Sequence, residues 1–319
     1  MTTERSAQPA SSPARTPTPD LNLYLEGMPA EAISPAQQVW RRLKRHYGAR
    51  LGGTIIIFFL IVSVIAPFAW PYDARTDLNL AIKLQPPSPE HWLGTDNLGR
   101  DVLIRLIHGM PVSLQVGVFS VALALIGGAF LGLVAGLASG SVDNIIMRVM
   151  DILLSFPSLL LAIAVVAMRG PGLTNTMIAI AIVNIPTYAR LARSMALQVR
   201  EQDFILAARS LGASQAHILV NHLLPNSLSP LIVQSTLGIG GAILQAAALG
   251  FLGLGQQPPF PEWGVMLSDT YRFLTVGAWW VLLPPGIAIM TSVLAFNLLG
   301  DGLRDALDPR LAQAGVKPR

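Results

Sequence analysis

The feature that most constrains this chain is a series of six long apolar segments separated by polar ones. They cover about residues 54–70, 112–138, 149–168, 173–192, 229–252 and 275–299. The shortest run has 17 residues, and a helix of that length spans roughly 26 Å, which is just enough to cross the hydrocarbon core of a bilayer. The sequence therefore predicts an all-α membrane protein with six transmembrane helices.

The composition agrees with this expectation. Hydrophobic residues make up 52% of the 319 residues and charged residues only 13%, whereas soluble domains carry about 25% charged residues. The net charge is +4, but the basic residues sit at the ends of apolar segments, as membrane topology requires, and this argues against a nucleic-acid partner. The chain has no cysteine, and its five histidines show no metal-ligand spacing, so we expect no metal site and no cofactor.

The apolar runs and the polar stretches between them divide the chain. The expected parts are a partly disordered cytoplasmic tail (1–50), a first transmembrane helix (51–70), an extracytoplasmic loop (71–111), a core with five transmembrane helices (112–302) and a cytoplasmic tail (303–319). The disorder is expected because residues 1–20 are rich in Ser, Thr, Pro and Ala and hold almost no large apolar residue.

Lysine and arginine counts predict the orientation of these parts. With the N-terminus in the cytoplasm, the inner segments hold 16 basic residues and the outer segments hold 6. Cytoplasmic loops of membrane proteins carry the excess of Lys and Arg. Both termini are therefore expected on the cytoplasmic side.

The spans hold almost no ionisable residue in their middles. Asp151 is expected near the cytoplasmic end of its span. Carriers driven by protons or ions usually keep charged side chains at depth, so their near absence indicates that another subunit supplies the energy. The chain also lacks a G-x-x-x-x-G-K-[ST] run, so we expect no ATPase activity of its own and no enzymatic chemistry.

Small residues and prolines mark several spans. Gly128, Gly132 and Gly136 fall four apart on one helical face, which favours close packing of helices within the subunit over a mobile gate or a subunit contact. Pro157 and Pro186 are expected to kink their helices.

The polar segment 193–228, on the expected cytoplasmic side, has the pattern of a helical hairpin. Its first helix is expected to begin near Asp203, which can cap it, and to end at Gly212, a natural left-handed stop. Ala207 and Ala208 give this helix a flat patch with high helix propensity.

The second helix of the hairpin is expected to begin at Ser214 and to run to about Leu223. Pro225 is expected to end it, and Ser229-Pro230 to begin the fifth span. Such a hairpin fits either a groove on another protein or a free surface, and the residues alone favour neither.

The same segment resembles the signature of permease subunits of ABC importers, which reads Glu-Ala-Ala, three residues, Gly, nine residues, then Ile-x-Leu-Pro. The positions that match it at this spacing are Ala207, Ala208, Gly212, Leu224 and Pro225. Two positions depart from it, since Leu206 replaces the glutamate and His222 replaces the isoleucine. The resemblance implies that the five matching residues couple this chain to an ATPase subunit, while any salt bridge of the glutamate is lost.

Three further stretches resemble the dipeptide, oligopeptide and nickel permease family, and within it the C-type subunit. They are WLGTDNLGRDVL at 92–103, DILLSFPS at 151–158 and NLLGDGLRDALDP at 297–309. The resemblance covers about residues 50–310 and implies the type I ABC importer permease fold. For the polar loop within 92–103 we favour a structural role over contact with a solute.

The resemblance also implies a transporter with several subunits. Its other parts would be two ATP-binding subunits, a second homologous permease subunit and an extracytoplasmic solute-binding protein, placed in a bacterial or archaeal inner membrane. This chain would form half of the pathway for peptides, nickel or related small solutes. The alternatives are a self-sufficient secondary carrier or channel, which the missing charges disfavour, and a membrane anchor, which leaves the hairpin unexplained.

Overall fold

A computed structural model describes residues 34–308 of the chain. This range is helical, with no strand and a single isolated bridge between Thr95 and Asp101. The α-helices are α2 Pro35–Leu43, α3 Tyr47–Ala69, α4 Val102–Ala138, α5 Gly140–Ser155, α6 Ser158–Arg169, α7 Leu173–Arg200, α8 Asp203–Ser210, α9 Gln215–Ile218, α10 Leu224–Phe251, α11 Trp263–Thr270 and α12 Leu283–Leu307. The short helices are η1 Leu80–Ile82, η2 Leu219–Leu223, η3 Tyr271–Val276 and η4 Trp279–Val281. The disorder expected for residues 1–20 and most of the expected C-terminal tail lie outside the described residues.

Four helical stretches in the described part of the chain are long and apolar enough to cross a membrane. They are Tyr47–Ala69, Val102–Ala138, Gln215–Phe251 and Trp279–Leu307. Helices α5 and α6 meet this standard together, with a bend of 96° between them, and would give a fifth span. The kink expected at Pro157 is confirmed, because this proline lies at the break and directly precedes α6.

The expected span at 173–192 corresponds to α7, which is long enough at 28 residues but is not among these apolar stretches. One side of α7 carries polar and charged side chains, and these lower its hydropathy. Pro186 lies inside α7, which continues past it to Arg200, so α7 extends eight residues beyond the expected end of the span.

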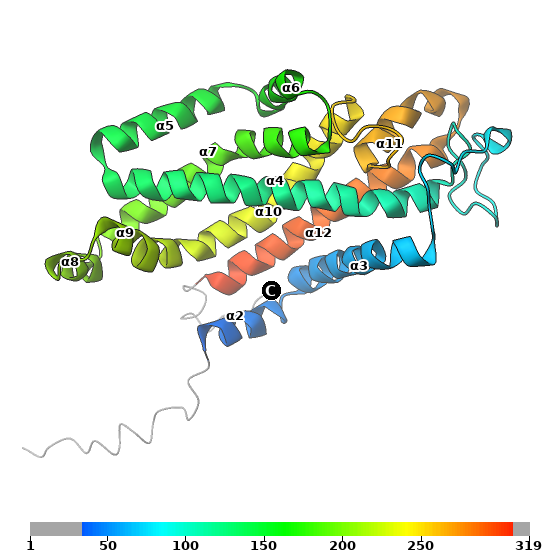
Figure 1. Cartoon of the computed structure of the whole chain (residues 1–319). Helices are drawn as coiled ribbons and strands as arrows, with labels where there is room; N and C mark the ends of the chain where they lie inside the picture. The colour runs from blue at the N-terminus through cyan, green and yellow to red at the C-terminus, as the bar shows by residue number, and fades with distance from the viewer. Residues whose placement is uncertain (1–33, 309–319) are drawn as a thin grey trace, which may run out of the picture. The chain divides into compact units, whose positions relative to one another are not determined.

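The helices from α3 onward pack as a bundle around α4 (Figure 1). Helix α4 lies against both α7 and α10, while α12 packs between α10 and α3. Helices α8 and α9 lie at one end of this bundle, and the segment 71–101 lies with α11 at the other. Because α4 joins the segment 71–101 to the helices beside α8 and α9, it connects the two ends.

Glycines bring α4 and α7 into close contact. A Cβ on Gly132 would lie 2.1 Å from the carbonyl oxygen of Ala189, and a Cβ on Gly136 would lie 2.5 Å from the Cβ of Ala196. Gly128 meets the backbone of α7 in the same way, 2.6 Å from a carbonyl oxygen. This stripe packs helices within the subunit, as the four-residue spacing predicted.

Candidate functional site

The helical hairpin expected at 193–228 begins with α8, which covers Ala207 and Ala208. Its N-cap is Gln202, which makes no side-chain hydrogen bond to the helix. The prediction that Asp203 caps α8 is wrong, since Asp203 is the first helical residue. Its carboxylate lies in the first turn, where it still favours the positive end of the helix dipole.

Gly212 ends α8 with a complete Schellman motif. Its N–H donates to the carbonyl of Arg209 at 2.9 Å, and the N–H of Ala213 donates to the carbonyl of Ala208 at 3.0 Å. Gly212 has φ +83, so the predicted left-handed stop is confirmed. A Cβ at this position would have no atom within 4 Å, so there is room for a side chain. The reason for glycine here is the left-handed backbone conformation.

The second helix, α9, begins as predicted. The Oγ of Ser214 accepts a hydrogen bond from the N–H of His217 at 3.2 Å and caps the helix. A π turn, Leu219–Leu223, then joins α9 directly to α10.

The expectation that Pro225 ends this helix, and that Ser229-Pro230 begins the next span, is wrong. Pro225 lies in the first turn of α10, where its missing N–H costs little, and Pro230 lies inside the helix. The wider π turn shifts the hydrogen-bond register before Pro225. The side chains of Asn226 and Ser227 donate to the backbone carbonyls of His222 and Leu223 at 2.7 and 2.8 Å. These two carbonyl groups, at the junction of the π turn and α10, therefore have hydrogen-bond donors.

The inner side of the hairpin is anchored in the core. Ile205 of α8, Ile218 of α9 and Leu223 of the π turn are fully buried in one hydrophobic cluster. The ring of His222, which stands where the signature has isoleucine, lies 5.9 Å from Phe204 and 5.6 Å from His217. This ring contact links α8 to the π turn two residues before Leu224.

The outer side of the hairpin exposes several apolar side chains, with the charged Asp203 and Arg209 among them. Ala207 and Pro225 are exposed, and Ala208 and Leu224 are partly buried. Leu206, in place of the signature's glutamate, is 54% exposed and Leu211 is 89% exposed. Phe204 and Leu211 were not predicted as site residues. Large apolar side chains next to a pair of small residues indicate a contact surface, and this pattern is visible in the sequence.

A second polar cluster lies at the other end of the bundle. Asp96 is 1% exposed, and its carboxylate accepts from the Nε of Arg100 at 2.7 Å and from Arg105. Arg105 also donates to Asp269 at 3.4 Å, which ties this loop to α11. The expected structural role of the loop at 92–103 is supported by this burial.

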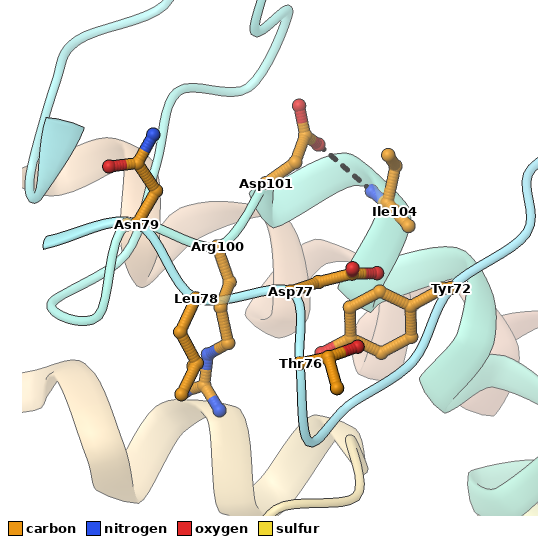
Figure 2. A pocket seen from close by; sticks show the side chains of 9 residues that line it. Tyr72, Thr76, Asp77, Leu78, Asn79, Arg100, Asp101 and Ile104 are labelled. Atoms are coloured by element: carbon orange, nitrogen blue, oxygen red, sulfur yellow. Dashed lines mark hydrogen bonds between the residues drawn. The ribbon is translucent and has the colours of Figure 1, made fainter.

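Beside this cluster lies a hollow of about 370 Å³ (Figure 2). Asp101 caps α4 at its rim by accepting from the N–H of Ile104 at 3.0 Å. Arg100, Asp77 and Tyr72 also line the hollow. Since Arg100 is already paired with Asp96, the hollow offers no free cationic group.

Comparison with known proteins places the chain in a family. Residues 128–313 match the family described as binding-protein-dependent transport system inner membrane component, and residues 34–87 match the N-terminal TM domain of oligopeptide transport permease C. The chain belongs to this family of inner membrane components. It is thus a multi-pass permease subunit of an ABC importer with the type I permease fold, as the resemblance predicted, and its family works with ATPase and binding-protein partners.

The relatives are permeases, and their similarity to this chain covers nearly their whole length. The dipeptide transport system permease protein DppC of Alkalihalophilus pseudofirmus is 49% identical over 311 residues, which cover 98% of this chain and 99% of the relative. The di/tripeptide transport system permease protein DppC of Pseudomonas aeruginosa is 48% identical, covering 88% and 94% of the two chains. The glutathione transport system permease protein GsiD of Pectobacterium atrosepticum is 45% identical, covering 87% and 92%.

Proposed function

We propose that this permease forms half of the pathway through which small peptides enter the cell, and that α8 and α9 dock it to an ATP-hydrolysing subunit. The observation that carries the docking proposal is the hairpin tip. It is anchored by Ile205 and Ile218 on its inner side, and it presents Ala207 and Leu211 on an exposed outer side. An apolar surface of this kind at the end of a membrane bundle fits a protein partner.

The complete importer has two ATP-binding subunits, a second homologous permease subunit and an extracytoplasmic solute-binding protein. In this arrangement both termini and the hairpin face the cytoplasm, and the segment 71–101 and α11 face outward. The excess of basic residues in the inner segments supports this orientation. ATP hydrolysis belongs to the partner subunits, since the chain holds no phosphate-binding loop of the G-x-x-x-x-G-K-[ST] type.

The helical joint gives the docking site a mechanical role. Helix α9 continues through the π turn into α10, and the stretch Gln215–Phe251 is one of the apolar spans. When ATP binding closes the ATPase pair, a displacement of α8 and α9 is carried along α10 into the membrane. The pathway then alternates between inward and outward openings as a switch between two packings of rigid helices.

The solute class follows from the relatives. Their names refer to dipeptides, di- and tripeptides and glutathione, all of which are small peptides. This supports a peptide over nickel as the solute. Uptake by a deletion strain, with and without this chain, across dipeptides, tripeptides, glutathione and Ni²⁺ tests the choice, and uptake of Ni²⁺ alone would contradict it.

The docking proposal predicts that Gly212→Asp abolishes uptake while the protein still inserts in the membrane. A side chain at φ +83 costs about 1 kcal/mol or more, which is too little to unfold the bundle but enough to disturb the Schellman turn. The added charge also disfavours docking against an apolar groove. Ala207→Arg should act in the same way through its bulk.

The matched control is Gly277→Asp. Gly277 also has φ +83 and open surroundings, but it lies between η3 and η4, away from the hairpin. We expect the ATPase subunits to co-purify with the Gly277→Asp protein and not with the Gly212→Asp protein. Normal uptake by both Gly212→Asp and Ala207→Arg proteins would show that the hairpin does not couple the subunits.

A further inference from the structure

Helix α7 has two different long faces. One face packs on α4 through Ala189 and Ala196, which meet the glycines of α4. The opposite face is polar and exposed, and its residues are Thr187, Arg190, Ser194 and Gln198. Steps of three and four residues place these side chains along one side of the helix.

Helix α5 carries a second exposed polar stripe. Its residues are Asn144, Arg148, Asp151 and Ser155, again at steps of three and four. The two stripes meet where Arg190 donates from its Nη2 to the Oδ1 of Asp151 at 2.7 Å. Both side chains remain more than half exposed, at 54% for Arg190 and 57% for Asp151.

The packing of α4 on α7 gives the position of the Arg190–Asp151 pair along the axis of the bundle. Gly128 lies against the carbonyl of Ile185 and Gly132 against that of Ala189, so Arg190 lies near Gly132. Close to this level α4 exposes Ile126 at 69% and Phe130 at 62%. From residue 111 to its end at residue 138, α4 has no ionisable residue, which indicates that this part of the bundle lies at membrane depth.

The pair lies away from the ends at which α5 begins and α7 finishes. Helix α5 begins at Gly140 and α7 ends at Arg200, so Asp151 and Arg190 lie 11 and 10 residues from those two ends, and Asp151 lies four residues before the other end of α5 at Ser155. The separations of 11 and 10 residues correspond to roughly 15 Å along a helix. A charged pair at such depth faces protein or water and not lipid, because exposure to hydrocarbon is costly.

The pair is not the main contact between α5 and α7. Arg193 makes two hydrogen bonds to Asp143, from its Nε at 2.5 Å and its Nη2 at 2.6 Å, and Asp143 is only 12% exposed. That bidentate bridge already fixes the two helices at their shared end. Arg190, in contrast, has five N–H donors, of which a single one bonds to Asp151.

Resting on the proposed function, we propose that the polar faces of α5 and α7 form this subunit's wall of the translocation pathway, with Asp151 and Arg190 contacting the charged groups of the passing peptide. The exposed guanidinium offers free donors to a carboxylate, and the exposed carboxylate accepts from an ammonium group. An exposed pair of this kind binds weakly, as a pathway requires, because a solute that binds tightly cannot leave.

Thiol labelling tests the location of the wall. The chain has no cysteine, so Thr187→Cys can be compared with Ile126→Cys, an exposed position near the same level on α4. In the assembled importer, in inverted vesicles, a charged thiol reagent should label Thr187→Cys and leave Ile126→Cys unlabelled. Labelling of both variants would place this level outside the membrane, and labelling of neither would place α7 against protein. Either result overturns the inference.

Peptide charge tests the role of the pair. We expect Arg190→Gln to lower uptake of an acidic dipeptide relative to a basic one, and Asp151→Asn to shift this ratio in the opposite direction, each by about threefold, in line with the energy of an exposed pair. A purely structural pair would slow both peptides equally in both variants, and that result overturns the inference. Absence of ATP-driven uptake by the wild-type importer would overturn the proposed function and the inference together. Wild-type uptake with unchanged ratios would overturn the inference alone.

Discussion

Asp96 is the buried charge on which the loop before α4 depends. It accepts hydrogen bonds from the backbone N–H groups of Leu98 and Arg100 at 2.8 and 3.0 Å, in addition to those of the two arginines. Asp96→Asn keeps the shape but leaves Arg100 and Arg105 with only the partly exposed Asp269 as a counter-charge, at 3.7 and 3.4 Å. Breaking a buried pair in this way costs roughly 3–5 kcal/mol, so we expect a clearly lower melting temperature of the purified complex.

The control at this scale is Asp77→Asn, the same substitution in the same loop. Asp77 is exposed, and we expect its replacement to change the melting temperature little. A melting temperature of the Asp96→Asn complex equal to that of the Asp77→Asn complex would show that the Asp96 network does not stabilise the loop.

At single residues, the sequence predicted those features that depend on local backbone chemistry. Gly212 and Ser214 have the roles that a left-handed stop and an N-cap require, and both are readable from residue type and spacing. Asp203 was misassigned because Gln202 holds the cap position without a side-chain bond, and no local rule favours glutamine there. The exposed Phe204 was missed because the signature concerns only the small residues beside it.

Helix pairs are the scale at which the α4 stripe can be tested. Gly132→Ala places a Cβ 2.1 Å from the carbonyl oxygen of Ala189, so α7 must move away. Overpacking of this kind costs about 1–3 kcal/mol and should lower the yield of folded protein. Gly127→Ala is the matched control, because its Cβ would lie 3.6 Å from Ile185, an ordinary contact distance. Equal yields from the two variants, measured by size-exclusion chromatography of the tagged protein, would contradict this account of the contact.

At the scale of whole elements, five of the six spans expected from the sequence fall in helices that are long and apolar enough to cross a membrane, if the bent pair α5 and α6 is counted as one span. It placed the ends less well. Pro225 and Pro230 read as a helix boundary, but a π turn and side-chain hydrogen bonds carry the helix through them. Helix α7 extends to Arg200 because one of its faces packs on α4. This packing does not depend on the polarity of the opposite face of α7. Apolar runs report lipid contact, so the run at 173–192 located α7 but not its polar end, which carries Arg193 and Arg200.

For the molecule as a whole, the orientation is a prediction that labelling can test. Single cysteines introduced at Ser88 and Ser210 should mark the two sides, since the chain has no cysteine of its own. An impermeant thiol reagent applied to intact cells should label Ser88→Cys and not Ser210→Cys. The reverse pattern would invert the orientation proposed for the hairpin.

The central claim is that ATP hydrolysed by partner subunits drives peptide movement through this permease. The most direct measurement is uptake of a labelled dipeptide into vesicles that contain this chain, alone or with its partner permease and ATPase subunits, with binding protein on the outer side and ATP on the cytoplasmic side. We predict uptake only by the complete set, only with ATP, and none under a proton gradient alone. Robust uptake by this chain alone, driven by a proton gradient, would contradict the account and identify a self-sufficient carrier.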